Sequence, residues 1–222
     1  MKKQQLTYQM TQSLPYWLYL PEDYAESDKQ YPLILFLHGA GERGDDLAGV
    51  TVHGIPKKLT AGEELPFIVI APQCPLQNWW ASYTETLIAI LDTVIASHRV
   101  DEQRIYLTGL SMGGFGTWWL ASEYPQRFAA LVPVCAPAPN IMGFPERMEK
   151  IAHLPIWAFH GDADDIVPIS ESEKVVTVLE SLNADVQFTV YPDVDHNSWD
   201  ATYDNPALYA WFLQHQLQDS ES

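Results

Sequence analysis

Residues 104–114 read RIYLTGLSMGG, and this stretch decides the fold that we expect. An apolar run leads into the pattern Gly-x-Ser-x-Gly around Ser111, and a helical pattern begins at Gly113. A strand, a sharp turn and a helix in this order would lift the serine oxygen above the end of a sheet. Glycines are needed beside the serine because side chains there would clash with neighbouring backbone. We interpret Ser111 as a nucleophile, the alternative being a plain glycine-rich turn.

Apolar runs on both sides of this stretch predict an α/β fold. The expected strands are residues 16–20, 33–37, 67–71, 104–108, 130–134, 156–159 and 186–191. Runs without alternation are typical of strands buried on both faces, as in a mostly parallel sheet. Helical patterns lie at 87–95, 113–124, 171–182 and 207–217. We expect one domain over residues 1–222, with helices on both faces of the central sheet and a loose tail from about residue 218.

Charge and composition argue against several classes of partner. The chain has 12 Lys plus Arg against 29 Asp plus Glu, a net charge of −17. That charge should repel nucleic acids and anionic lipids, so we expect neither as a partner. There is no apolar run long enough for a membrane span and no signal-peptide pattern, so the expected location is cytoplasmic. Two cysteines without a Cys-x-x-Cys pair predict neither a disulfide framework nor a zinc site.

A serine nucleophile needs a base, and the base needs an orienting carboxylate. In this fold they follow the serine in the order Asp, His, at the ends of later strands. His196 follows the run 186–191 and is the best candidate for the base. Three carboxylates follow the run 156–159 and compete for the other role: Asp162, Asp164 and Asp165.

The other six histidines have different expected roles. His38 and His160 each precede a glycine at the end of a strand, where they would shape a turn. His98 and His215 are expected on helices and solvated, and His53 and His153 belong to no motif. A cation site is a further alternative for the acidic loops, with Asp193 and Asp195 joining the three aspartates, although the spacing is not that of a calcium-binding loop.

The loop after the run 33–37 should help to hold negative charge on a substrate oxygen. It reads HGAGERGDD over residues 38–46. Its glycines allow backbone N–H groups to turn inward, as in an oxyanion hole. It lacks the Gly-Lys-Ser/Thr ending of a phosphate-binding loop and the spacing of a dinucleotide-binding loop. The alternative is a flexible turn between a strand and a helix.

Together these segments resemble the α/β-hydrolase superfamily. Within it they are similar to compact serine esterases of the dienelactone-hydrolase-like and phospholipase/carboxylesterase-like kind, a group that also contains feruloyl esterases and predicted peptidases. The matching segments are YPLILFLHGAGERGDD (31–46), VDEQRIYLTGLSMGGFGTWWLA (100–121), HGDADDIVP (160–168) and DVDHNSW (193–199). The resemblance implies a single α/β-hydrolase domain.

The resemblance also implies the site residues and the reaction. Its catalytic triad would be Ser111, Asp164 and His196, and its oxyanion amides would be those of Ala40 and Met112. True dienelactone hydrolases use cysteine, so the serine implies ordinary ester chemistry. The implied activity is a serine carboxylesterase that hydrolyses a small ester through an acyl-enzyme, with no metal and no cofactor. The alternatives are a serine peptidase of the same fold and a non-catalytic binding protein.

The pocket is less sharply predicted. Residues 136–154 are too few for a large cap domain, but they could form a small flap that contains Ile141, Met142, Gly143 and Phe144. Trp79, Trp80 and Trp199 could form an aromatic wall, whereas Trp118 and Trp119 are expected in the core. The expected substrate-binding residues are Gly41, Glu42, Trp80, Phe144, Ile166 and Trp199. The sequence makes no prediction of the acyl group, the alcohol or the oligomeric state.

The two cysteines follow separate strands. The strand order that the resemblance implies places two other strands between Cys74 and Cys135. Three strand spacings are about 14 Å, well beyond the roughly 7 Å that a disulfide allows between Cα atoms. Both cysteines are therefore predicted to be free thiols.

Overall fold

A computed structural model of the chain describes residues 12–139 and 144–217. These residues form a seven-stranded sheet in the order β1-β3-β2-β4-β5-β6-β7. The strands are β1 (Tyr16–Tyr19), β2 (Tyr31–Leu37), β3 (Ile68–Pro72), β4 (Val100–Leu110), β5 (Ala130–Val134), β6 (Ile156–Gly161) and β7 (Val186–Tyr191). β1 pairs antiparallel with β3, and the neighbouring pairs from β3 to β7 are parallel. The predicted runs are all strands, which confirms the mostly parallel sheet.

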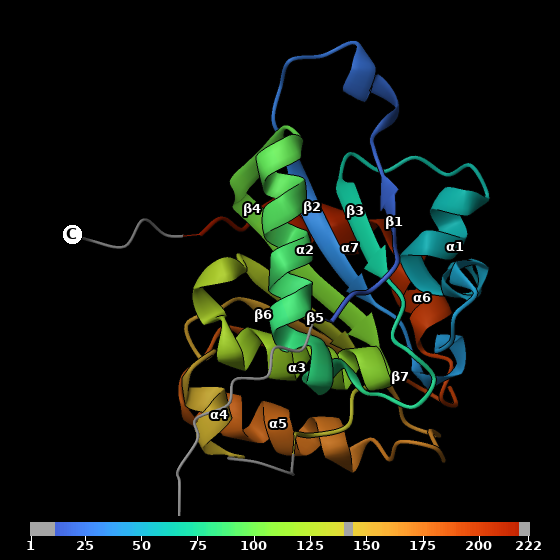
Figure 1. Cartoon of the computed structure of the whole chain (residues 1–222). Helices are drawn as coiled ribbons and strands as arrows, with labels where there is room; N and C mark the ends of the chain where they lie inside the picture. Colours follow the sequence, from blue (N-terminus) through green and yellow to red (C-terminus); the bar gives the residue numbers. More distant parts are fainter. Residues whose placement is uncertain (1–11, 140–143, 218–222) are drawn as a thin grey trace, which may run out of the picture.

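Helices cover both faces of this sheet, as predicted (Figure 1). One face carries α2 (Thr84–Ser97), α3 (Met112–Glu123), α4 (Glu146–Glu149) and α5 (Ser170–Ser181). The other carries α1 (Gly54–Thr60), α6 (Trp199–Tyr203) and α7 (Pro206–Phe212). Short 3-10 helices are η1 (Glu22–Ala25), η2 (Ala40–Glu42), η3 (Leu47–Thr51), η4 (Trp80–Tyr83) and η5 (Pro125–Arg127). α7 ends at Phe212, five residues before the predicted end.

The central strand β2 explains why the apolar runs do not alternate. Leu33, Leu35 and Leu37 belong to the hydrophobic cluster under α2 and α3, whereas Ile34 and Phe36 belong to the cluster under α1, α6 and α7. Both sets are fully buried. Burying each such side chain contributes roughly 1.5–3 kcal/mol, so both faces of the strand favour the sheet.

The connection from β5 to β6 contains the four-residue helix α4. Phe144 precedes it and packs, partly buried, against the cluster under α2 and α3. The other predicted flap residues, Ile141, Met142 and Gly143, lie outside the described residues, as does the predicted tail from residue 218. Over the described part of the chain, the helices are too short or too polar to cross a membrane.

The C-terminal ends of the parallel strands meet at one edge of the sheet. Leu37 is in register with Gly109 on the neighbouring strand, and Gly161 is in register with Tyr191. The loops that follow β2, β4, β6 and β7 therefore lie along the same edge. These loops carry the residues that the sequence singled out for chemistry.

Candidate active site

Ser111 lies in a sharp turn between β4 and α3. Its backbone has φ 53° and ψ −115°, a conformation that costs a residue with a side chain on the order of 1–3 kcal/mol. Close contacts explain the glycines on either side. A Cβ atom on Gly113 would lie 1.9 Å from the carbonyl oxygen of Leu37, and one on Gly109 would lie 2.4 Å from the carbonyl oxygen of Gly113.

The structure brings Ser111, His196 and Asp164 together in one hydrogen-bonded chain. The Oγ of Ser111 is 2.9 Å from Nε2 of His196, and Nδ1 of His196 is 2.7 Å from Oδ2 of Asp164. The other two candidate carboxylates are exposed: Asp162 accepts a bond from the backbone N–H of Asp193. Of the three aspartates, Asp164 is the one that reaches the histidine.

The loops that hold Asp164 and His196 are fastened to each other. The N–H of Ala163 donates to the carbonyl oxygen of Val194 at 3.0 Å. A Cβ atom on Gly161 would lie 2.2 Å from that same oxygen. Glycine at this position therefore permits the close packing of the two loops, which sets the distance between the carboxylate and the imidazole.

The Asp164 carboxylate is fully buried, and its charge is met by N–H groups. Oδ1 accepts from the backbone N–H of Ile166 at 2.9 Å and of Val167 at 2.8 Å. Oδ2 accepts from His196 and also lies 3.1 Å from Nε2 of His160. The side chain itself is 0% exposed. His160 was expected only to shape a turn, so its contact with Asp164 is a feature that the sequence analysis missed.

Ala40 and Met112 each begin a helix beside the serine. Ala40 is the first residue of η2, and Met112 is the first residue of α3. The first N–H groups of a helix have no partner within that helix, so they are available to bind a negatively charged oxygen. The residue before Ala40 packs against the residue before Ser111: a Cβ atom on Gly39 would lie 2.7 Å from Cδ1 of Leu110.

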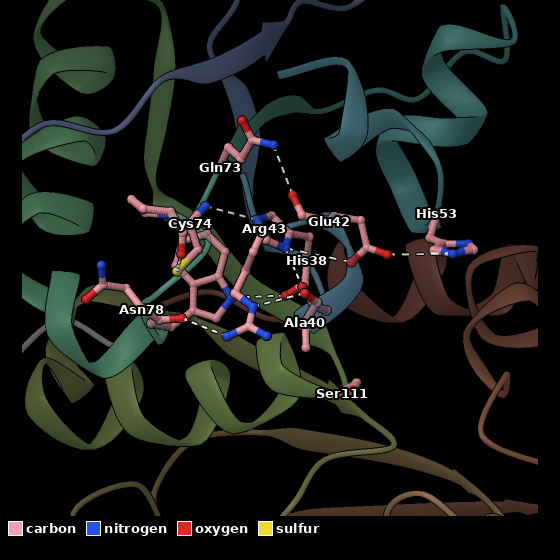
Figure 2. A network of polar contacts seen from close by, with 12 residues as sticks. His38, Ala40, Glu42, Arg43, His53, Gln73, Cys74, Asn78 and Ser111 are labelled. Carbon is pink, nitrogen blue, oxygen red and sulfur yellow. Dashed lines mark hydrogen bonds and ion pairs between the residues drawn. The ribbon is translucent and has the colours of Figure 1, made fainter. Parts of the chain in front are cut away.

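His38 holds the peptide group that contains the Ala40 amide (Figure 2). Its Nε2 accepts from the backbone N–H of Cys74 at 3.0 Å, so the ring proton lies on Nδ1. Nδ1 donates to the carbonyl oxygen of Gly39 at 2.6 Å, and this carbonyl shares a peptide group with the N–H of Ala40. Burial lowers the pKa of His38 to about 4, which keeps the ring neutral.

Further side chains fasten this loop to the loop after β3, as Figure 2 shows. Arg43 donates from Nε to the carbonyl oxygen of Ala40 at 2.9 Å and from Nη1 to that of Asn78 at 3.3 Å. Gln73 donates to the carbonyl oxygen of Glu42 at 3.0 Å. Side-chain hydrogen bonds thus fix the loop, which argues against the alternative of a flexible turn.

Two neighbouring tryptophans, both predicted to line an aromatic wall, differ in exposure. Trp80 is 1% exposed and donates from Nε1 to the carbonyl oxygen of His38, so its expected contact with substrate is wrong. Trp79 is 49% exposed and packs edge-on against Phe115, the residue after the second glycine that follows Ser111. The sequence could not distinguish them, because both follow the same proline-rich loop.

The other predicted pocket residues differ in their contacts and in their exposure. The ring of Trp199 lies edge-on to that of His196, with centroids 5.4 Å apart, and against that of His53 at 5.2 Å. His53 Nε2 lies 3.6 Å from Oε1 of Glu42, whose buried carboxyl has a raised pKa because of desolvation. Gly41 is exposed, and Ile166 is 67% exposed.

The remaining expectations have mixed outcomes. Cys74 and Cys135 are buried and free, and Trp118 and Trp119 lie in the core, as predicted. His98 and His215 follow α2 and α7 instead of lying on them, and both are half-buried, so their expected placement is wrong. Within residues 12–139 and 144–217, no three His, Cys, Asp or Glu side chains are grouped so that they could hold a metal ion.

Comparisons with known proteins agree with this geometry. The sequence profile of the phospholipase/carboxylesterase family matches residues 77–205, more than half of the chain. The crystal structure of a thermostable esterase superposes with a TM-score of 0.77 at 33% identity, covering 91% of this chain and 59% of that one.

Two curated relatives are longer proteins. A bifunctional acetylxylan esterase/xylanase of Neocallimastix patriciarum is 25% identical over 87% of this chain and 27% of its own length. A probable feruloyl esterase C of Aspergillus terreus is 31% identical over 69% of this chain and 56% of its own length. The chain thus spans about a quarter to a half of these two relatives. On the family match, the fold and the structural superposition, the chain belongs to the phospholipase/carboxylesterase family of α/β-hydrolases.

Proposed function

We propose that the chain is a serine carboxylesterase, with Ser111 as nucleophile, His196 as general base and Asp164 as the orienting carboxylate. The observation that carries the proposal is the chain of hydrogen bonds from Ser111 Oγ through both ring nitrogens of His196 to Asp164. An ionised carboxylate only accepts hydrogen bonds, so it keeps the ring proton of His196 on Nδ1. Nε2 then has a lone pair for the serine proton.

In the proposed reaction, Ser111 attacks the ester carbonyl while His196 takes its proton. The amides of Ala40 and Met112 donate to the oxygen that becomes negative, and such donors contribute roughly 3–4 kcal/mol each to the barrier reduction. His196 then protonates the leaving alcohol, and a water molecule activated by the same histidine releases the acid. His38 supports the binding of the negative oxygen, because its hydrogen bond to the Gly39 carbonyl fixes the orientation of the Gly39–Ala40 peptide.

The proposed substrate surface is formed by the loops around Ser111. Gly41, Ile166 and Trp199 remain candidates from the sequence, together with Glu42 and Phe144, and Trp79 replaces the buried Trp80. Trp79 offers a half-exposed indole braced by Phe115 at 6.1 Å, a surface that suits an apolar or ring-containing group.

A serine peptidase would use the same three residues, and an amide differs from an ester in its leaving group. An amine leaves only after protonation, so a peptidase needs a subsite that holds the amide nitrogen within reach of His196. Among the described residues we find no subsite that would suit an amide but not an ester. We therefore rank ester hydrolysis first and peptide hydrolysis second.

The test compares p-nitrophenyl acetate and butyrate with p-nitroanilides of short peptides, using the wild-type chain and the Ser111→Ala variant. We expect faster turnover of the esters and a loss of about 10⁴-fold or more on removing the hydroxyl. A fluorophosphonate probe should also add its mass to the peptide that contains Ser111. Undiminished turnover by Ser111→Ala, or faster cleavage of the anilides, would contradict the proposal.

A further inference from the structure

A second histidine, His160, approaches the same carboxylate oxygen of Asp164 as His196 does. It is 0% exposed at the end of β6. Its Nε2 lies 3.1 Å from Oδ2 of Asp164 and 2.8 Å from the carbonyl oxygen of Val167. Its Nδ1 lies 2.7 Å from Oγ of Ser172 on α5. One buried imidazole thus joins the carboxylate to a helix.

These contacts determine which ring nitrogen carries the proton. Nε2 faces a carboxylate oxygen and a carbonyl oxygen, both of which only accept hydrogen bonds, so Nε2 must be protonated. Nδ1 is then the acceptor for the hydroxyl of Ser172 at 2.7 Å, which is nearer than that hydroxyl's other acceptor, the carbonyl oxygen of Ala136 at 3.3 Å. Burial lowers the pKa of His160, which agrees with a neutral ring in this tautomer.

We propose that His160 is a positioning residue for the reaction: its Nε2–H, which donates to the carbonyl oxygen of Val167, also lies against Oδ2 of Asp164, steadies this oxygen and moderates the negative charge that it offers to His196. The inference rests on the proposed esterase function, because it concerns the same triad. Oδ2 is shared between two imidazoles, so each N–H takes part of its electron density. A carboxylate with one donor fewer would bind the imidazolium of His196 more strongly.

The sign of the effect follows from this sharing. Without the N–H of His160, the acidic limb of kcat/KM would shift to higher pH. Other charged groups lie near His196. Asp195 is its neighbour in the sequence, and Asp200 follows Trp199 on α6. Trp199 contacts both His196 and His53, and His53 pairs with Glu42. All of these remain in place when His160 is changed.

Two substitutions separate the ends of the imidazole. In His160→Gln, the side-chain amide nitrogen reaches the position of Nε2 and can donate to Asp164. In His160→Asn, the shorter amide reaches the position of Nδ1 and can contact only Ser172. Both remove the ring and both keep an amide, so each is the matched control of the other. Ser172→Ala removes the contact at the opposite end and leaves Nε2 untouched.

The experiment measures kcat and KM of the three variants with p-nitrophenyl acetate across the acidic limb. We expect His160→Asn to lower kcat about ten- to hundredfold, to leave KM within about twofold, and to move the limb upward by up to about one pH unit. His160→Gln should restore the limb and most of kcat. Ser172→Ala should lower the melting temperature and leave the limb in place.

Equal behaviour of the Asn and Gln variants, or an unmoved limb in His160→Asn, would overturn the proposal. If a variant does not fold, the ¹⁵N chemical shifts of the histidine ring in the native chain decide instead. At neutral pH they should show His160 with its proton on Nε2, and a neutral ring with its proton on Nδ1 would overturn the proposal. An inactive wild-type chain would contradict the esterase function, whereas the ring tautomer would still test His160.

Discussion

Replacing Asp164 by asparagine replaces one accepting carboxylate oxygen by an NH₂ group, which is a donor. The groups that surround this side chain are N–H donors as well. The carboxylate accepts from two backbone N–H groups at Oδ1 and lies between two imidazole nitrogens at Oδ2. An asparagine amide has one oxygen and one NH₂ group. Whichever way it points, its NH₂ group meets two N–H donors.

The orientation of the amide can be derived from what each donor can do. The backbone N–H groups of Ile166 and Val167 cannot move their protons, and leaving both without an acceptor would cost about 1–3 kcal/mol each. His196 and His160 can move theirs to the opposite ring nitrogen. The NH₂ group should therefore face the histidines and turn His196 into the tautomer with its proton on Nε2.

In that tautomer His196 cannot accept the proton of the serine. Losing a correctly oriented base lowers kcat by about 10⁴-fold, which corresponds to a barrier higher by roughly 5.5 kcal/mol. Circular dichroism should show a folded variant, and steady-state kinetics with p-nitrophenyl acetate should show the loss in kcat with little change in KM. Asp162→Asn and Asp165→Asn are the matched controls, since both carboxylates are exposed and neither reaches His196. If Asp164→Asn retains more than about a tenth of kcat, or a control loses more, the reasoning is wrong.

Three more predictions concern stability and reactivity. Gly113→Ala should prevent folding, because its methyl carbon would lie 1.9 Å from a backbone oxygen, whereas Gly41→Ala, with no atom within 4 Å, should keep the wild-type melting temperature. Glu42→Gln should raise the free energy of unfolding near pH 8 but not near pH 4. Burial raises the pKa of this carboxyl, so its contribution to stability is lost as the pH rises and the group ionises; melts at both pH values check the sign. Cys74 and Cys135 are buried, so a thiol reagent should titrate two groups only after denaturation, and a reaction of the native chain would contradict the structure.

Much of the fold could be predicted from the sequence, because each strand is a short apolar run with a clear end. β5 and β7 have the predicted bounds, and α3 and α5 are each displaced by one residue. The short helices α1 and α6 were not predicted. With seven and five residues they are too short to repeat an apolar stripe, and tertiary contacts decide their conformation.

The candidate site was predictable where the proposed chemistry demands a particular residue at a particular turn. Ser111 and His196 could be selected from their position after strands, but Asp164 was chosen from two neighbours only by resemblance. The distinction depends on burial, since Asp164 turns inward to four N–H groups while Asp162 and Asp165 face solvent. Trp79 and Trp80 illustrate the same limit, because adjacent residues have the same sequence surroundings and opposite exposures.

A His-Gly pair lies at the end of two of the strands, His38-Gly39 and His160-Gly161. Both histidines are neutral hydrogen-bond donors beside the candidate site, and the neutrality has a physical reason. His38 and His160 are both buried, and burial lowers the pKa of each, so each ring can donate a hydrogen bond without adding a charge. A lysine or arginine in place of His160 would also stabilise the Asp164 carboxylate. It would, however, repel the imidazolium that His196 must become during the proposed reaction, and at close range this repulsion is worth several kcal/mol. A neutral N–H fixes the carboxylate and leaves its charge for His196. The glycine after each histidine serves the same arrangement, because Gly39 and Gly161 allow the next loop to approach to distances that a Cβ atom would prevent.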